Sequence, residues 1–239
     1  MACLFDIEYK TLADFGVKGG NLSAVVVDCA QGSQDWFGSR LGIMTASNAA
    51  LLITSKGEPA KSKSLDTFMN GCIAEQLLGT VECNTASTPA MERGTNLEPR
   101  ARAWYAIDRD VDVREAGFVF RDDTKTSGAS PDGLCADRCL EIKCPMRKGM
   151  IGARLGIEKT GKAPTQYLAQ MQFQMWCFGL DLCDFVLYTP EPQIPNAIVT
   201  VEADPVAQKN LTELVPAFAE RVDAGVKVLA ALQDDGDFQ

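Results

Sequence analysis

The chain contains no histidine among its 239 residues. That absence excludes hydrolases built on Ser-His-Asp or Cys-His pairs, HEXXH metalloproteases and nucleases that use a histidine base. Long apolar runs are also missing: none approaches the roughly 18 residues of a membrane span, and the N-terminus lacks the basic and apolar segments of a signal peptide. Any chemistry must therefore rely on carboxylates, lysine, serine, tyrosine or thiols, and we expect no membrane association.

Positive charge is scarce as well, with 23 Lys and Arg against 32 Asp and Glu and a net charge of −9. This balance argues mildly against a nucleic-acid partner, because phosphate binding depends on Lys and Arg. The bases are unevenly distributed, however. Residues 138–162 hold seven bases and two acids, whereas residues 202–239 hold three bases and eight acids. A solvated surface and a phosphate-binding surface both fit this basic block.

The nine cysteines are an odd number, and no CxxC pair occurs. In a chain without a secretion signal they indicate a reduced, cytoplasmic protein rather than a disulfide framework. Cys135, Cys139 and Cys144 lie in the stretch SPDGLCADRCLEIKCP, but a closed zinc site needs a fourth ligand. The odd spacing of Cys139 and Cys144 also directs them to opposite faces of a strand. We therefore favour core packing over a thiol-bound metal.

The pattern of apolar residues predicts a single α/β domain over residues 1–239, with a central mixed β-sheet flanked by helices. Helices are expected within 33–53 (a short helix, a turn and a second helix), over 62–79, 90–108 and 164–179, and from Pro205 to about Leu232. Strands are expected over 113–122, 126–133, 139–145, 183–190 and 197–204. Residues 233–239 form an acidic tail.

Carboxylates between the cysteines offer a second interpretation of the same stretch. An acidic-x-Lys triplet alone is weak evidence, because the chain contains three. On a strand, however, Glu141 and Lys143 share one face while Ile142 points into the core, and a hairpin brings Asp132 beside Glu141. Two carboxylates and the Ile142 carbonyl suit Mg²⁺ or Mn²⁺, and Lys143 is placed to position or activate water.

Further residues fit a site that binds phosphate. Glu98 can add a carboxylate from the preceding helix, and Gln170 can contact water or phosphate from the amphipathic helix at 164–179. Arg40, followed by Thr45 and Ser47 at a helix start, suits a terminal phosphate. Each also fits a structural role: a surface glutamate, a polar helix edge, and an N-cap beside a surface arginine.

Four sequence blocks resemble the lambda-exonuclease-like (YqaJ-type) viral recombinase nucleases of the PD-(D/E)xK superfamily. They are DWFGSRLGIMTAS, GTNLEPRA, SPDGL followed by LEIKCP, and YLAQMQFQMWCFGLDLCDFVLYTP, and the signature covers about residues 30–205. The resemblance implies a Mg²⁺-dependent 5′-to-3′ exodeoxyribonuclease, with Mn²⁺ as a substitute and two ions per active site. Such an enzyme digests one strand of linear double-stranded DNA and leaves 3′ overhangs for recombination.

The resemblance also implies a homotrimeric ring around DNA, a single-strand annealing protein as partner, and a phage or prophage protein in the cytoplasm of a bacterial host. Carried over by position, the metal ligands are Asp132, Glu141, the Ile142 carbonyl and Glu98, with Lys143 and Gln170 completing the catalytic set. The implied DNA-binding residues are Arg40, Thr45 and Ser47 for the 5′-phosphate and Met91 as an apolar wedge at the terminal base pair. The basic block adds Arg147, Lys148 and Arg154.

Two other functions stay open on the sequence. The first is a restriction-type endonuclease with the same core, which would also cut closed circles. The second is a catalytically degenerate protein that binds DNA ends or acts as an adaptor.

Overall fold

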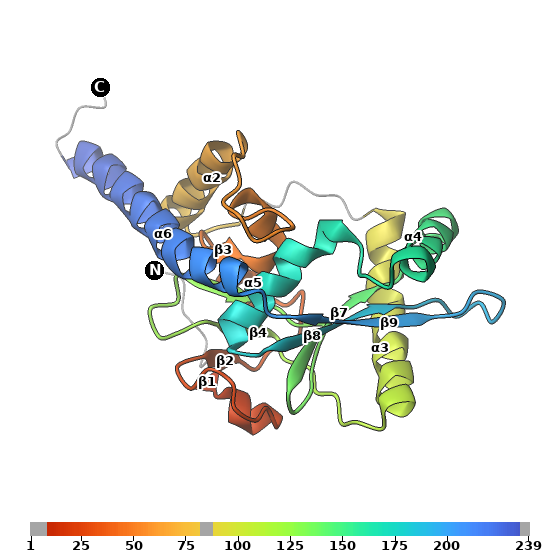
Figure 1. The fold of residues 1–239 in the computed structure, drawn as a ribbon. Helices are drawn as coiled ribbons and strands as arrows, with labels where there is room; N and C mark the ends of the chain where they lie inside the picture. The colour runs from red at the N-terminus through yellow and green to blue at the C-terminus, as the bar shows by residue number, and fades with distance from the viewer. Residues whose placement is uncertain (1–8, 82–87, 235–239) are drawn as a thin grey trace.

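The computed structural model describes residues 9–81 and 88–234, so the acidic tail expected at the C-terminus lies outside it from residue 235 onward (Figure 1). Its α-helices are α1 (Gln34–Ser39), α2 (Leu65–Leu78), α3 (Pro89–Arg109), α4 (Arg147–Thr160), α5 (Leu168–Phe178) and α6 (Pro205–Asp234). Its 3-10 helices are η1 (Leu12–Phe15), η2 (Ala46–Leu51) and η3 (Thr165–Tyr167). None of the helices in these ranges is long and apolar enough to cross a membrane.

The strands divide between two sheets. One holds β1 (Tyr9–Lys10), β2 (Val25–Val27), β4 (Phe118–Phe120), β5 (Ser127–Ala129) and β3 (Met44–Thr45), and the other holds β6 (Gly133–Leu134), β7 (Arg138–Lys143), β8 (Leu182–Leu187) and β9 (Ala197–Glu202), each in that order. β7 and β8 are parallel, and β6 and β9 flank them antiparallel. The parallel pair needs the long crossover through α4 and α5. A mixed α/β fold with flanking helices is thus confirmed, with two sheets in place of one.

Residues 130–132 carry the chain from one sheet to the other. They follow the end of β5 and precede β6. Pro131 has no N–H, so the ladder of β5 does not continue through it. In the expected hairpin, now seen as β6 and β7, Gly133 pairs with Leu140. This register places Asp132 opposite Glu141.

The two faces of β7 enter different parts of the core. Leu140, Ile142 and Cys144 pack with residues of α3, whereas Cys139 belongs to the larger cluster that surrounds α5. The odd spacing of Cys139 and Cys144 predicted this separation. Nine of the eleven residues of α5 are buried, and Figure 1 shows this helix across the sheet from α3. Side chains on alternate residues of β7 therefore meet either α5 or α3.

The second helix expected within 33–53 forms as the 3-10 helix η2, and the two-residue strand β3 lies between it and α1. Met44 of β3 pairs in parallel with Ser127 of β5 and is fully buried. Sheet pairing thus shapes the segment that was expected to be only a turn. The other helices form near the predicted bounds, and α2 and α5 end at Gly79 and Gly179 in the left-handed conformation.

Candidate active site

The carboxylate of Asp132 lies against the backbone of β7. Its Oδ2 accepts a hydrogen bond from the Ile142 N–H at 2.6 Å, and its own N–H donates to the Leu140 carbonyl at 3.2 Å. Because the N–H and C=O of an extended residue point to the same side, the Ile142 carbonyl also faces Asp132. The hairpin thus gathers the oxygen atoms that the sequence predicted to be neighbours.

Glu141 is fully buried, and its two carboxylate oxygens have different surroundings. Oε2 accepts hydrogen bonds from Gln170 Nε2 and Gln174 Nε2, each at 2.8 Å. Oε1 forms an ion pair with the Lys143 ammonium but accepts no hydrogen bond. Gln170 was predicted from the sequence, whereas Gln174 was missed. The signal for Gln174 is its position one helical turn after Gln170, on the same face of α5.

The charges of this cluster shift the pKa values of its members. Burial, followed by the negative charge of Glu141, raises the pKa of Asp132 to about 8, although Lys143 opposes this shift. Burial lowers the pKa of Lys143, but the charges of Glu141 and Asp132 outweigh it and raise this pKa above its ordinary value. Lys143 therefore remains an ammonium ion at neutral pH, with its charge directed at the two carboxylates.

Glu98 is held beside this cluster by an arginine that the sequence analysis missed. Arg102 Nη1 donates to Glu98 Oε1 at 2.6 Å and to the backbone carbonyl of Asp132 at 2.7 Å. Its Nη2 donates to Glu115 Oε1 at 2.5 Å. Arg102 follows Glu98 by four residues on α3, a spacing that allows such pairs. It is buried, so it fixes α3 against the connection between the two sheets.

The donor chemistry of this cluster fits a hard divalent cation. Within residues 9–81 and 88–234, no three His, Cys, Asp or Glu side chains are arranged closely enough to form a ready-made metal-binding group. The oxygens of Asp132, Glu141, Glu98 and Ile142 are nevertheless those that Mg²⁺ prefers. Glu141 Oε1 is buried without a hydrogen bond, and a cation would offset the repulsion that raises the pKa of Asp132. These are the residues that would hold it.

A second polar cluster is formed by Arg40, Thr45 and Ser47. Arg40 Nη2 donates to Ser47 Oγ at 3.3 Å, and the hydroxyls of Thr45 and Ser47 are 3.1 Å apart. Asn48, another residue missed from the sequence, donates to Thr45 Oγ1 at 3.2 Å. The expected N-cap is not formed, because Thr45 precedes η2 but its side chain makes no capping hydrogen bond. The three predicted phosphate ligands thus converge.

Arg40 is held by its aromatic and acidic neighbours. Its guanidinium lies 4.3 Å from the centroid of the Trp36 ring. Burial lowers the pKa of Arg40, and the charge of Glu75 opposes this shift. Glu75 also accepts a hydrogen bond from the Gly42 N–H at 2.8 Å. Gly42 has a φ of +66°, and a Cβ there would meet Gln76 at 2.4 Å, so only glycine fits this turn.

The two clusters share one wall. Trp36 Nε1 donates to Ser130 Oγ at 2.7 Å, and Gln31 Nε2 donates to the Pro131 carbonyl at 2.9 Å. These bonds tie α1 and the loop before it to the residues that precede Asp132. A cavity of about 810 Å³ lies between α1, α2 and α3, and Arg40, Thr45 and Glu98 line it. The cavity therefore links the Arg40 cluster to Glu98, whereas Asp132, Glu141 and Lys143 do not line it.

Met91 lies at the mouth of this cavity. It is in the first turn of α3, where its N–H donates to Thr88 Oγ1 at 3.2 Å. Its side chain is 53% exposed and lines the cavity. Met91 therefore lines the same cavity as Arg40 and Glu98, and its role as a wedge stays a prediction.

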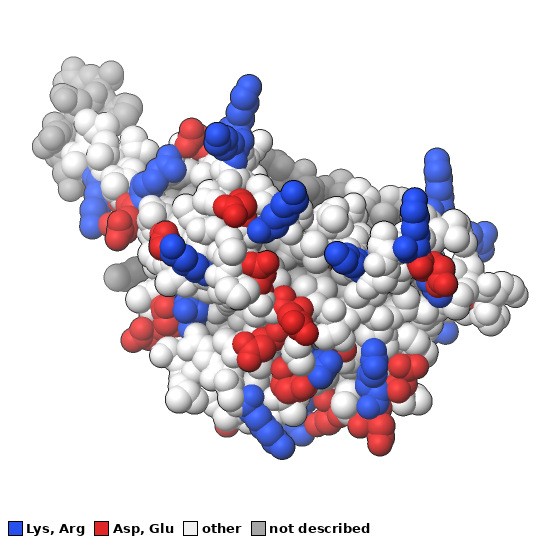
Figure 2. All heavy atoms as spheres, in the orientation of Figure 1, with Lys and Arg blue, Asp and Glu red and all other residues white. Residues whose placement is uncertain are grey.

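Three residues of the basic block, Arg147, Lys148 and Arg154, lie on α4. Arg147 and Lys148 are exposed, with Arg147 3.8 Å from Glu191. Arg154 Nη1 donates to Glu158 at 2.9 Å. None of these three predicted DNA-binding residues lines the cavity. Figure 2 shows Lys and Arg side chains mixed with Asp and Glu over the face displayed there, without one continuous basic surface.

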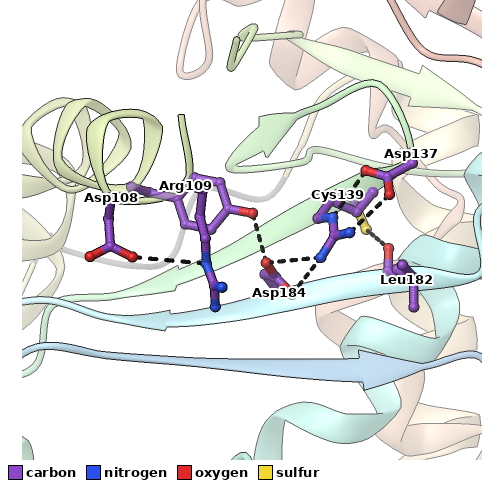
Figure 3. A network of polar contacts seen from close by, with 8 residues as sticks. Asp108, Arg109, Asp137, Cys139, Leu182 and Asp184 are labelled. Atoms are coloured by element: carbon purple, nitrogen blue, oxygen red, sulfur yellow. Dashed lines mark hydrogen bonds and ion pairs between the residues drawn. The ribbon is translucent and has the colours of Figure 1, made fainter. Parts of the chain in front are cut away.

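Another buried carboxylate lies on the opposite face of the same sheet. Asp184 of β8 accepts a hydrogen bond from the Tyr105 hydroxyl at 2.6 Å and contacts Arg138 Nη1 at 3.4 Å. Arg138 in turn donates to Asp137 at 2.8 Å. Figure 3 shows Asp184 between these partners, on the strand beside β7. Asp184 is fully buried, yet both of its oxygens have partners.

The chain is similar to solved exonucleases. Its sequence is 35% identical to LHK-Exo in the crystal structure of that protein with dAMP, with a TM-score of 0.73 over 85% of this chain and 99% of that one. Another crystal structure of this alkaline exonuclease, from Laribacter hongkongensis, gives 34% identity and a TM-score of 0.72 over the same shares. A phage-related exonuclease from Haemophilus somnus 129PT shares the fold, with a TM-score of 0.55 at 16% identity over 80% of this chain and 96% of that one.

One curated relative is the uncharacterized protein R354 of Acanthamoeba polyphaga mimivirus. It is 28% identical over 108 residues, which are 40% of this chain and 19% of that protein. The chain therefore spans less than a fifth of the length of R354. The model of the YqaJ-like viral recombinase domain matches residues 35–181, which include both polar clusters described above. Since this match takes in more than half of the chain, the chain belongs to the family of YqaJ-like viral recombinase domains.

Proposed function

We propose that the chain is a divalent-metal-dependent exodeoxyribonuclease that digests one strand of linear double-stranded DNA from its 5′ end. The observation that carries this proposal is that Arg40 and Thr45 line one cavity with Glu98, which neighbours Asp132 in the second, buried cluster. One cluster, around Glu141 and Lys143, has the residues for phosphodiester hydrolysis, and the other, around Arg40, has those for a terminal phosphate. The similarity to an alkaline exonuclease supports it. So does the dAMP in that relative's crystal structure, because this nucleotide is the kind of product such an enzyme releases.

The residues of the carboxylate cluster have three proposed roles: metal binding, orientation of water and positioning of Glu141. Mg²⁺ would be held by Asp132, Glu141, Glu98 and the Ile142 carbonyl. We also propose that Mn²⁺ can substitute for it and that a second ion binds at the same site. A divalent cation polarises the phosphoryl oxygen and lowers the pKa of a bound water. Lys143 is protonated, so it donates hydrogen bonds that orient the attacking water and stabilise negative charge developing on the phosphate. Gln170 fixes the Glu141 carboxylate from α5.

The second cluster supports the proposed polarity. A 5′-phosphate carries two negative charges and three acceptor oxygens, which match the Arg40 guanidinium and the hydroxyls of Thr45 and Ser47. Anchoring the terminal phosphate there would place a neighbouring phosphodiester toward Glu98 and the carboxylates. Met91 would contact the terminal base pair. Digestion from the 5′ end leaves a 3′ single-stranded overhang.

Family membership supports the wider setting of this proposal. We propose a homotrimer that encircles DNA, a single-strand annealing protein that receives the overhang, and a phage or prophage origin in the cytoplasm of a bacterial host. A ring limits escape of the DNA, which would make a strongly basic surface unnecessary for a chain with a net charge of −9.

The test is digestion of a linear duplex labelled at one 5′ or one 3′ end, with Mg²⁺ and with EDTA. We expect early release of the 5′ label as mononucleotide, retention of the 3′ label, no digestion in EDTA, and no cutting of covalently closed circles. Absence of digestion by the wild-type protein, or equal digestion by Lys143→Ala, contradicts the proposal. Cutting of closed circles would indicate a restriction-type endonuclease, and binding of ends without turnover would indicate a degenerate site.

A further inference from the structure

Two glutamines of α5 bind the same oxygen of Glu141. Gln170 and Gln174 are four residues apart, so they lie on one face of the helix. Each donates its Nε2 to Glu141 Oε2 at 2.8 Å. Gln170 is half-buried, whereas Gln174 is fully buried. Glu141 Oε2 is thus bound by two amides, while Oε1 pairs with the Lys143 ammonium.

The other end of the Gln174 amide lies against two thiols. Gln174 Oε1 accepts from Cys183 Sγ at 3.7 Å and lies 3.9 Å from Cys139 Sγ, whose single proton has the Leu182 carbonyl as a second acceptor at 3.9 Å. These cysteines are paired residues on β7 and β8, and both are fully buried. Burial raises the pKa of Cys183 well above its ordinary value, so this group stays a thiol and can donate. Gln174 therefore links the thiol pair on the sheet to the carboxylate.

This arrangement allows only one orientation of the Gln174 amide. An ionised carboxylate only accepts hydrogen bonds, so the group that faces Glu141 Oε2 must be the NH₂. A flipped amide would place its carbonyl oxygen against the carboxylate and leave two buried acceptors in contact. Leaving a buried polar group unpaired is costly, and water does not reach a fully buried side chain to replace the bond. The Cys139 and Cys183 thiols stabilise the required orientation.

We infer that Gln174 is a positioning residue for Glu141: it fixes Oε2 so that Oε1 alone is presented to the cation and to Lys143. This inference rests on the proposed nuclease function and deepens it. Gln170 alone would fix one oxygen with one hydrogen bond, about which the carboxylate can still pivot. A second donor from the next helical turn removes that freedom. Cys139 and Cys183 are part of this device because they orient its amide.

The test compares two buried glutamines of the same helix. Gln174→Met removes the donor at similar volume, and Gln172→Met is the matched control, because the Gln172 side chain binds the backbone of Glu202 and Asp204 instead. For Gln174→Met we expect kcat on linear duplex DNA to fall about tenfold or more with KM little changed, since a hydrogen bond to a charged group is lost. Mg²⁺ affinity, measured by calorimetry without DNA, should fall as well. Gln172→Met should keep both values.

If Gln174→Met folds and keeps the kcat and the Mg²⁺ affinity of the wild-type protein, the inference is overturned and the proposed function stands. If the wild-type protein itself does not digest DNA, the proposed function fails, and the calorimetry still decides whether Gln174 acts on the Mg²⁺ site. If Gln174→Met does not fold, the thiols supply the test. Cys139→Ala with Cys183→Ala should lower kcat, and the serine pair at the same positions should restore it. Equal kcat in the two pairs contradicts the inference.

Discussion

Two fully buried carboxylates, Glu141 and Asp184, lie on neighbouring strands of one sheet and face opposite sides of it. Asp184 faces α3 and is satisfied by the Tyr105 hydroxyl and the Arg138 guanidinium. Glu141 faces α5, with one oxygen bound by two amides and the other paired with the Lys143 ammonium. The same backbone therefore supports one carboxylate held by a hydroxyl and a guanidinium and one held by two amides and a lysine.

The difference distinguishes a structural carboxylate from a functional one. A buried charge with all its hydrogen bonds made has nothing left to offer a ligand, and removing it leaves its partners unpaired. The partner of Glu141 Oε1 is the Lys143 ammonium, whose side chain is 28% exposed and is therefore within reach of a ligand. Burial alone, or the presence of an acid on a strand, does not separate these cases. The pairing of each oxygen does.

The largest expected effect is on activity, from Lys143→Ala. Removing the ammonium leaves Glu141 Oε1 without its ion-pair partner and the phosphate without a charged donor. We expect the rate of duplex digestion to fall by about 10³-fold, near the upper effect of losing one preorganised donor. Steady-state kinetics with saturating Mg²⁺ measure it. A fall of less than tenfold would break the comparison, because Lys143 would then be structural like Arg138.

Asp184→Ala should act on stability instead. The Tyr105 hydroxyl and Arg138 would lose a buried partner, and we expect the free energy of unfolding to decrease by roughly 3 kcal/mol. Urea denaturation measures that loss, and digestion per folded molecule should match the wild-type value. If Asp184→Ala is as stable as the wild-type protein but inactive, the assignment of roles to the two carboxylates is reversed.

Arg40→Ala tests whether the buried guanidinium of Arg40 is a functional group, as Glu141 is, or a structural one, as Asp184 is. Within the described part of the chain, Arg40 forms no salt bridge, although burial lowers its pKa. Such a group is available to an anion. We expect Arg40→Ala to slow digestion of 5′-phosphorylated duplex by about tenfold, the effect of one charge-assisted hydrogen bond, and that of 5′-hydroxyl duplex much less. Equal losses on the two substrates would make Arg40 a structural or general backbone contact.

The smallest expected effect is on the pH dependence of stability in EDTA. The pKa of Asp132 is raised from 3.8 to about 8 in the folded chain, so the unfolded chain loses this proton first. Stability should therefore fall as pH rises from about 4 to 8, and the loss should be complete above pH 8. Asp132→Asn removes this contribution. Its Tm relative to wild type should rise between pH 5 and pH 8, and thermal melts at both pH values measure it.

If the Tm difference between Asp132→Asn and wild type does not depend on pH, the pKa of the Asp132 carboxyl is not raised in the folded chain. Adding Mg²⁺ sharpens the result. A cation bound at this carboxylate should reduce the pH dependence of the wild-type protein and leave that of the variant unchanged.

The site could be predicted from the sequence where the chemistry is local. The alternation of β7 and the Pro-Asp-Gly turn before it were enough to bring Asp132 beside Glu141 and Ile142. The hydroxyls of Thr45 and Ser47 are close in sequence to Arg40, so their convergence was also predictable. The apolar residues at 164–179 predicted helix α5. The structure buries nine of its eleven residues, so the helix is covered on nearly all sides.

Features set by tertiary pairing could not be predicted. β3 exists because β5 pairs with it, and the division into two sheets depends on register that no local pattern carries. Arg102 was an ordinary helix arginine until Glu98, Glu115 and the Asp132 carbonyl were seen around it. Gln174 was missed, although it lies one turn after Gln170 on the face of α5 that meets β7. Cys139, first considered as a metal ligand, instead contacts the Gln174 amide.

The roles of the two carboxylates are tested by measuring both the digestion rate and the free energy of unfolding of Glu141→Gln and Asp184→Asn. Each substitution replaces a buried carboxylate with an amide. The account predicts that Glu141→Gln unfolds cooperatively but does not digest linear duplex DNA in Mg²⁺. It predicts that Asp184→Asn loses stability yet digests DNA at the wild-type rate per folded molecule. Digestion at the wild-type rate by Glu141→Gln would contradict the account.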